Sequence, residues 1–274
     1  MPGSLQEVEQ VGEQGYGGER VAGAAAHRGE ALRAAPTAEV DVDGPRTPGV
    51  PGGFIVDVAR RDRAGAPAIA VRVDGFELSI PWVDPDRDAA GVVRAVTHLA
   101  RWERLRRLGE GRSSSLAADI ELQLFAAARG DRAVPPGRSP MARAAEQALT
   151  YGVDGAPPRL FVRLANHAPR DLWVALVDLA DDLSITPLFQ AQAIAAGVAV
   201  DVGGGGPVEF VLPAAVAPRP GASARDHLKV IMSEAPFDAA PFALPPLGEA
   251  RRSTAEPPPL DWSAATTTVL VTVP

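Results

Sequence analysis

The four histidines of this sequence are the side chains best suited to acid–base or metal chemistry near neutral pH. They lie far apart in the chain, at His27, His98, His167 and His227, and no His-Glu-x-x-His pair is present. A zinc site would therefore have to be assembled from distant segments. We expect His98 on the exposed or boundary side of a helix and His167 in a turn, so neither is predicted to bind a metal.

A short acidic cluster, Asp178, Asp181 and Asp182, loosely resembles a calcium-binding loop. It lacks the alternating oxygen ligands, the central glycine and the distal glutamate of a helix–loop–helix calcium site. Aspartate is also common in turns between strands, because its side chain hydrogen-bonds to nearby backbone groups. The cluster is therefore predicted to be a turn rather than a metal site.

The glycine run Gly203–Gly206 is the stretch most similar to a phosphate-binding loop. Such a loop needs Gly-Lys-Ser/Thr leading into a helix, so that backbone N–H groups and the lysine can hold the phosphates. Here Pro207 and a predicted strand follow. The run is therefore predicted to be a flexible hairpin connection.

Nucleophilic catalysis has few candidates. The chain contains no cysteine, which excludes a thiolate nucleophile, thiolate metal ligands and disulfide bonds. Ser223 follows Gly221, but no glycine stands two residues after it, as a serine-hydrolase elbow requires. Ser113–Ser115 is predicted to be a loop. Asp226 and His227 are adjacent on a predicted strand, where neighbouring side chains point to opposite faces, so they make a poor catalytic pair.

These patterns predict no catalytic residue, no cofactor-binding or metal site and no cofactor, so we expect that the chain is not an enzyme by itself. A hydrolase of unrecognised type is the alternative, with the acidic cluster and His227 as its candidates. Convergence of these side chains in one concave pocket would favour the alternative, and their separation on turns would count against it.

The composition restricts the partners and the compartment. Of 274 residues, 46% are hydrophobic, which is enough for a core, and the net charge of −7 argues against nucleic acid as a partner. The N-terminus lacks a basic start followed by an apolar run, and no apolar stretch is long enough for a bilayer. We therefore expect a cytoplasmic protein without a membrane partner. Its many Ala, Gly, Pro and Val residues, and the use of Arg for every basic residue except Lys229, favour a GC-rich bacterial source.

The elements expected to position these residues are mostly strands. Residues 1–52 are predicted to be a disordered segment or linker, because they have few large apolar residues. Residues 53–130 are predicted to be a small α+β unit, with a hairpin at Asp74-Gly75, a helix and a strand over Leu116–Ala128. The helix begins at Asp86 or Asp88 and ends near Leu108-Gly109.

The rest of the chain is predicted to be a connector followed by a sandwich. Residues 131–156 form the connector, with a possible short helix over Met141–Leu149, and residues 157–274 form an immunoglobulin-like (Ig-like) antiparallel β-sandwich. Asp171–Leu179 is apolar on both faces, which is typical of a central strand that is covered on each side. The fold class is therefore α+β and mainly β. Proline-rich Ala240–Leu247 and Glu256–Trp262 are predicted to be extended and solvated, with Trp173 and Trp262 as core or rim anchors.

Several motifs in the second half of the chain carry a family resemblance. They are FVRLANHAPRDLWVALVDLADDLSITPLF, AAGVAVDV and DHLKVIMSEAPFDAAPFALP, within Arg159–Asp238, and HLARWERLRRLGEG at His98–Gly111. This pattern resembles the C-terminal β-sandwich, and the stretch before it, of bacterial caspase-like (metacaspase-type) proteins. The resemblance covers residues from about 90 to 274.

The departure from that family concerns its chemistry. A caspase-like peptidase uses a histidine base and a cysteine nucleophile, and this sequence has no cysteine. The resemblance therefore carries over no catalytic residue. It implies a non-catalytic accessory or protein-interaction module, whose partner would be a caspase-like protease or the target of one. The alternative is a fragment of a caspase-family peptidase whose catalytic domain is encoded separately.

Overall fold

The computed structural model of the chain describes residues 56–63, 66–73, 76–80, 88–109, 116, 118–214, 216–247 and 262–274. These residues fall into two compact units that divide between Val92 and Val93. Strands dominate the regular structure, and the described part of the chain holds one α-helix. The predicted α+β, mainly β class is confirmed. The predicted disordered segment 1–52, His27, Ser113–Ser115 and Glu256–Asp261 lie outside the described residues.

The first unit contains a three-stranded antiparallel sheet of order β1-β2-β3. Its strands are β1 (Val56–Arg63), β2 (Ala66–Val73) and β3 (Phe76–Ile80). Val73, the last residue of β2, pairs with Phe76, the first residue of β3, so only two residues connect the strands. The hairpin predicted at Asp74-Gly75 is therefore confirmed by its flanking strands.

Helix α2 (Ala89–Arg106) begins and ends where the sequence predicts. The Asp88 carboxylate accepts a hydrogen bond of 2.7 Å from the Gly91 N–H, so Asp88 is the N-cap. Beyond the helix, Gly109 has φ +90°, and a Cβ atom there would lie 2.7 Å from the Ala264 carbonyl oxygen. Glycine is therefore required at this helix end both for its backbone conformation and for the close approach to Ala264.

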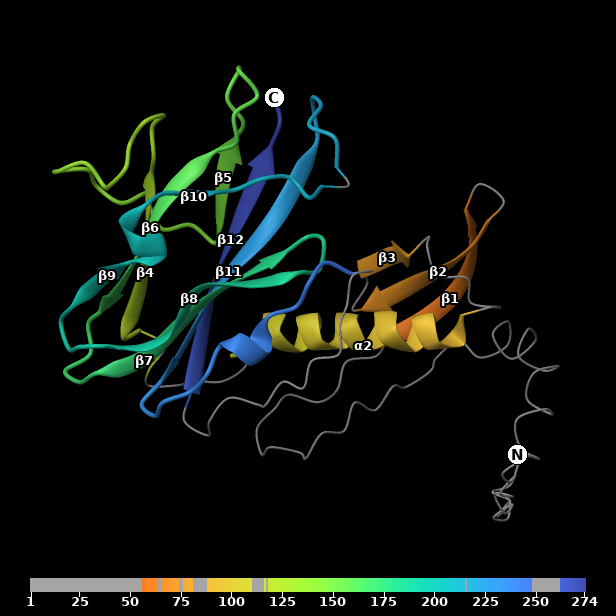
Figure 1. Ribbon diagram of the computed structural model, residues 1–274, viewed down its shortest axis with the longest axis horizontal. Helices are drawn as coiled ribbons and strands as arrows, with labels where there is room; N and C mark the ends of the chain where they lie inside the picture. The colour runs from red at the N-terminus through yellow and green to blue at the C-terminus, as the bar shows by residue number, and fades with distance from the viewer. Residues whose placement is uncertain are drawn as a thin grey trace, which may run out of the picture. The chain divides into compact units, whose positions relative to one another are not determined.

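The second unit is a sandwich of two sheets, coloured from yellow-green to blue in Figure 1. The smaller sheet has the order β10-β6-β4, with β9 also paired to β6. The larger sheet has the order β5-β12-β11-β7-β8, antiparallel except for the parallel pair β5 and β12. The bounds are β4 Ile120–Ala126, β5 Glu146–Thr150, β6 Arg159–Asn166, β7 Leu172–Ala180, β8 Ile185–Ile194, β9 Ala199–Asp201, β10 Val208–Glu209, β11 Ser223–Ser233 and β12 Trp262–Thr272.

Both faces of the larger sheet are covered. Leu176 of β7 and Leu228 of β11 lie on the inner face and belong to the hydrophobic core shared with β4 and β6. Val177 and Ile231 lie on the outer face and are also fully buried. Since successive strand residues alternate between faces, β7 is a central strand covered on each side, as its sequence predicts.

Helix α2 packs on the outer face of the larger sheet through polar as well as apolar contacts. Lys229 of β11 is 1% exposed, and its Nζ donates hydrogen bonds to the carbonyl oxygen of Arg106 and to Thr266 Oγ1. A cation at the last carbonyl of a helix is favourable, because that end of the helix carries a partial negative charge. The single lysine of the chain therefore ties the end of α2 to the sheet.

Strand pairing corrects the predicted boundaries at 130 and 156. Strand β4 pairs with β6, so the end of the predicted 53–130 unit belongs to the sandwich. Strand β5 pairs with β12, so the predicted 131–156 connector supplies a strand of the larger sheet. The short helix predicted over Met141–Leu149 is wrong for the same reason. Pairing with β12 satisfies this backbone as a strand, and the weak local helix preference does not decide its structure.

The proline-rich stretch Ala240–Leu247 is not solvated as predicted. It forms the 3₁₀ helix η2 (Ala240–Phe242), and Leu244 then pairs with Ile185 at the start of β8. The side chains of Phe242 and Leu244 are buried. Their apolar surface outweighs the preference of the neighbouring prolines for an exposed extended chain.

Candidate functional site

The three described histidines lie in separate parts of the second unit. His98 is 3% exposed on α2, which corrects the prediction of an exposed or boundary position. Its Nε2 donates a 2.9 Å hydrogen bond to the Leu183 carbonyl oxygen, and burial lowers its pKa. A histidine held neutral in this way connects α2 to the turn between β7 and β8.

His227 and Asp226 point to opposite faces of β11, as predicted. The ring of His227 lies 6.1 Å from that of Trp102 in an edge-to-face arrangement and is hydrogen-bonded to Thr268 Oγ1. Burial, and then the charge of Arg106, lower the pKa of His227. His227 is therefore part of the α2 interface and does not face the acidic side chains on the inner side of the sheet.

The predicted acidic cluster lies at the end of the sandwich where β7 ends and β11 begins. Asp178 is on β7, and Asp181 and Asp182 form the following turn, as predicted. Asp181 Oδ2 accepts a 2.7 Å hydrogen bond from the Arg225 N–H, and Asp182 Oδ1 accepts one of 2.9 Å from the Ser184 N–H. These bonds are typical of aspartate in a turn.

Asp226 is the acidic residue that the sequence did not group with the others. It is 5% exposed and lies diagonally across from Asp178, because Leu228 pairs with Asp178 and Asp226 pairs with Ala180. Only the antiparallel register of β7 and β11, which brings together segments about fifty residues apart, identifies Asp226 as a neighbour of Asp178. Among the described residues, no group of His, Asp and Glu side chains is arranged to hold a metal ion.

The glycine run does not form the predicted hairpin. Strands β9 and β10 both pair antiparallel with the same edge of β6, so the chain keeps its direction across the run. Between them lies η1 (Val202–Gly205), in which Gly203 and Gly204 have φ near +65°. Three successive glycines with positive φ are tolerated because glycine has no Cβ atom. The run is an insertion in one edge strand, and a strand follows it instead of a helix.

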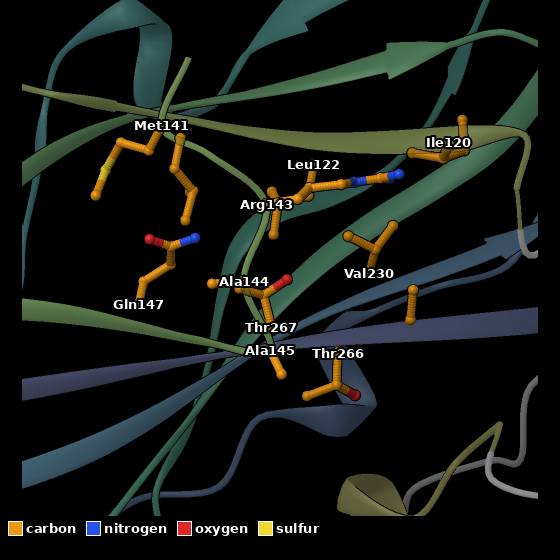
Figure 2. Close-up of a pocket in the computed structure, with 12 residues that line it drawn as sticks. Ile120, Leu122, Met141, Arg143, Ala144, Ala145, Gln147, Val230, Thr266 and Thr267 are labelled. Carbon is orange, nitrogen blue, oxygen red and sulfur yellow. The ribbon is translucent and has the colours of Figure 1, made fainter.

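A cavity of about 340 Å³ opens between the two sheets at the edge formed by β4 and β5. Its apolar lining comes from Ile120, Leu122, Leu124, Met141, Val230 and Ala265. Figure 2 shows the segment that runs past Met141, Arg143 and Ala144 to Ala145 at this opening, with Gln147 beside it. The acidic cluster and His227 do not line the cavity, which counts against a reaction centre there.

The backbone edge of β4 runs along this cavity. The Met141 N–H donates a 2.7 Å hydrogen bond to the Leu124 carbonyl oxygen, so Leu124 directs its backbone groups away from β6. Ile120 and Leu122 share that direction, because backbone groups alternate along a strand. Among the described residues, these two have no backbone hydrogen-bond partner on the outward side. This edge is not predicted from the sequence, because residues 131–156 have the composition of a connector.

Other sequence candidates have no catalytic surroundings in the described structure. Ser223 is exposed at the first position of β11, and no acid or base is hydrogen-bonded to its side chain in the described part of the chain. Trp173 is half-buried on β7, which fits a rim anchor. None of the described helices is long and apolar enough to cross a membrane.

Comparison with models of known protein families finds no match to this chain, and comparison with curated proteins finds none either. The resemblance to the accessory region of caspase-like proteins therefore rests on the sequence motifs alone.

Proposed function

We propose that this chain is a non-catalytic protein-interaction module that binds an extended segment of a partner protein at the open edge of β4. The observation that carries the proposal is the outward backbone of Ile120 and Leu122 beside a cavity lined by both aliphatic and polar side chains. An extended peptide can add to such an edge as a further strand, with its main chain giving affinity and its alternate side chains giving specificity.

The chain itself provides an example of this pairing. The Met141 N–H already bonds to the Leu124 carbonyl oxygen as an added strand would. The segment then leaves the edge to become β5, so the pairing stops before Leu122. A partner segment would continue along the edge toward Ile120.

The cavity indicates the chemistry of the partner segment. Aliphatic side chains line it together with the polar side chains of Arg143, Gln147, Thr266 and Thr267. Its volume of about 340 Å³ suits one or two side chains of the partner. Arg143 is exposed at the opening. The pKa of Glu121 is lowered first by the hydrogen bonds from Gln123 and His167, and the charge of Arg143 adds a smaller effect in the same direction. The segment that fits best is extended, places an apolar side chain in the cavity and carries a carboxylate within reach of Arg143.

The strand order supports an Ig-like interpretation of the sandwich, which we include in the proposal. In immunoglobulin-type sandwiches the first two strands share one sheet, and the third pairs beside the last two. Here β4 and β6 correspond to the first two strands, and β7 corresponds to the third, since it lies beside β11, and β11 lies beside β12. Strand β5, between β4 and β6 in the chain, pairs with β12 in the other sheet. Sandwiches of this type commonly act as recognition domains, although fold alone does not define function.

The family resemblance suggests which protein supplies the segment. We propose a caspase-like protease or the target of one, with this chain regulating or targeting the protease. This part of the proposal rests on the motifs from His98 to Asp238 and on the absence of a cysteine.

The experiment selects linear peptides from a random phage-displayed library on the full chain and measures their affinity for three variants. Ala265→Trp fills the cavity, and Leu122→Pro removes an outward N–H that the fold does not use. Ala193→Trp, at an exposed position on β8, is the matched control. Circular dichroism verifies that each variant is folded.

We expect the selected peptides to bind the wild-type chain and the control equally, and to lose about tenfold or more in affinity for the first two variants. Protection of the Leu122 amide from hydrogen exchange on binding would support strand addition directly. Equal binding to all variants, or selection of no peptide, would overturn the proposal.

A further inference from the structure

We infer that the carboxyl groups of Asp178 and Asp226 form a proton-dependent contact between β7 and β11, stable while the pair retains a proton and repulsive when both groups are ionised. The inference is independent of the peptide-binding proposal, because the two carboxyl groups do not line the cavity.

The geometry places two acids on one face of the sheet: Asp226 is 5% exposed, and Asp178 is half-buried with its Oδ1 atom fully buried. The antiparallel register sets Asp178 opposite Leu228 and Asp226 opposite Ala180, so both acids lie on the inner face. Diagonal neighbours of this kind lie roughly 7–8 Å apart at Cα, and their side chains can approach more closely. Leu228, which pairs with Asp178 and follows Asp226 by two residues on the same face of β11, is fully buried, so little water screens the two groups.

The hydrogen bonds around the pair do not balance two negative charges. Asp178 Oδ1 is buried and has no hydrogen-bond partner among the described residues. The neighbouring Asp181 and Asp182 add like charge from the turn. A protonated carboxyl group would supply the missing donor, because a neutral acid donates through its O–H.

The nearby basic groups are hydrogen-bonded to other partners, although the charges of Asp182 and Asp181 act on His98 and His227 respectively. On β11, Arg225 pairs with Glu146 at 3.2 Å, and Lys229 bonds to the Arg106 carbonyl oxygen on the outer face. His227 lies on that outer face as well, and the ring of His98 on α2 bonds to the backbone of the turn. The titratable and charged groups around the pair are therefore Asp181, Asp182, Arg225, His227, Lys229 and His98.

Burial and like charge act in the same direction on both acids. Burial, then Asp226 and Asp182, raise the pKa of Asp178 to about 8. Burial, then Asp181 and Asp182, raise the pKa of Asp226 to about 7. The folded chain therefore binds more protons than the unfolded chain from about pH 4 up to this range, and its stability falls as the pH rises through it.

The consequence is a local opening at this end of the sandwich near neutral pH. Ionisation separates the end of β7 from the start of β11 and loosens the turn whose Leu183 carbonyl accepts the hydrogen bond from His98. That hydrogen bond holds α2 against the larger sheet. The contact between Asp178 and Asp226 would therefore make the packing of α2 on the sheet depend on pH.

The test is urea unfolding of the full chain between pH 5 and pH 8, for wild type, Asp178→Asn and Asp226→Asn. Asp238→Asn, at an exposed carboxylate beyond the opposite end of β11, is the control. We expect the wild-type unfolding constant to rise with pH, by up to about tenfold per pH unit for each extra proton retained. Each of the two variants should flatten this dependence, and the control should keep it.

A variant-free measurement covers the case in which a substitution prevents folding. Carboxyl ¹³C NMR of the wild-type chain should show two aspartates that titrate above pH 6, well above the ordinary range for aspartate. Stability that is constant or increases from pH 5 to pH 8, or aspartates that all titrate below pH 5, would overturn the inference.

Discussion

The two ends of the sandwich treat buried polar groups in opposite ways. At the loop end, where β6 ends and β7 begins, Asn166 is 1% exposed and all its polar atoms are used. Its Nδ2 donates to the carbonyl oxygens of Arg170, Ile194 and Ala195, and its Oδ1 accepts from the Ala168 N–H. At the carboxylate end, where β7 ends and β11 begins, Asp178 keeps an unpartnered buried oxygen.

The two ends also differ in how their charged side chains are paired. The loop end pairs Arg170 with both Asp119 and Glu234, and His167 is hydrogen-bonded to Glu121. The carboxylate end gathers four acids. A satisfied polar network stabilises at every pH where its members keep their state, whereas a like-charged pair stabilises only while it is protonated. One end of the sandwich is therefore a fixed structural joint, and the other is conditional.

The largest expected effect is that of Asn166→Ala. The substitution removes the Asn166 partner of three carbonyl oxygens and of the Ala168 N–H, although the Ala195 carbonyl oxygen still accepts from the Val198 N–H. Each buried group that loses its partner destabilises the fold. We expect a loss of about 2–4 kcal/mol in the free energy of unfolding, measured by urea denaturation at pH 6. His167→Ala, at the exposed neighbouring position, should change stability by less than about 1 kcal/mol. A loss below that level for Asn166→Ala would contradict its role as a joint.

The second effect is the coupling between the two carboxylates. Either Asp178→Asn or Asp226→Asn removes the same repulsion, so the double variant should gain less stability at pH 8 than the sum of the single gains. Residues that share such a contact have coupling energies of about 0.5–3 kcal/mol. A double-mutant cycle by urea denaturation measures this energy, and the pair Asp226→Asn with Asp238→Asn should be additive. Additivity within the acidic pair would show that the two groups do not interact.

The contrast between the ends could be predicted from the sequence only in part. The turn at Asp181 and Asp182 is a local feature, and the two apolar faces of β7 are readable from alternation. The approach of Asp226 to Asp178 depends on the pairing of distant strands, which no local pattern contains. The pairing of the two acids at the carboxylate end therefore cannot be predicted without the register of β7 and β11.

Two other errors have the same cause. The segment of β5, Glu146–Thr150, has little β-branched or aromatic character, and it is a strand because β12 pairs with it. His98 is predicted at the exposed or boundary side of α2 because it lies at the edge of the helix face formed by the large apolar residues. The buried arc is wider than that, since small Ala95 and Ala100 also face the protein. Tertiary contacts decided both positions.

A smaller effect is expected for Arg170→Ala at the loop end. The substitution removes ion pairs of 2.7 Å with Glu234 and 3.4 Å with Asp119, but the arginine side chain is 40% exposed. Water and salt screen such pairs, so we expect a loss below about 1 kcal/mol at low salt, decreasing as salt is added. Urea denaturation at two salt concentrations measures it, with exposed Arg129→Ala as the control. A larger loss that salt leaves unchanged would mean that the loop end depends on this arginine for packing.

The smallest expected effect is the change with pH in the stability that Glu121 contributes at the loop end. The pKa of Glu121 is lowered from its ordinary 4.5, first by the hydrogen bond from Gln123 and then by the one from His167. A lowered pKa contributes stability above the unfolded value, and this is lost as the pH falls through the folded value. Glu121→Gln should therefore weaken the fold slightly at pH 6, by less than about 0.5 kcal/mol, and have no effect near pH 3.

Urea denaturation of Glu121→Gln and of wild type at both pH values tests this prediction, with Glu209→Gln as a comparison on the neighbouring edge strand β10. Acid should weaken the contribution of Glu121, whereas it should strengthen the contact between Asp178 and Asp226. If Glu121→Gln instead destabilised the chain more at pH 3 than at pH 6, the loop end would share the proton dependence of the carboxylate end. The distinction between a fixed and a conditional end would then fail, because both ends would be held by protonated acids.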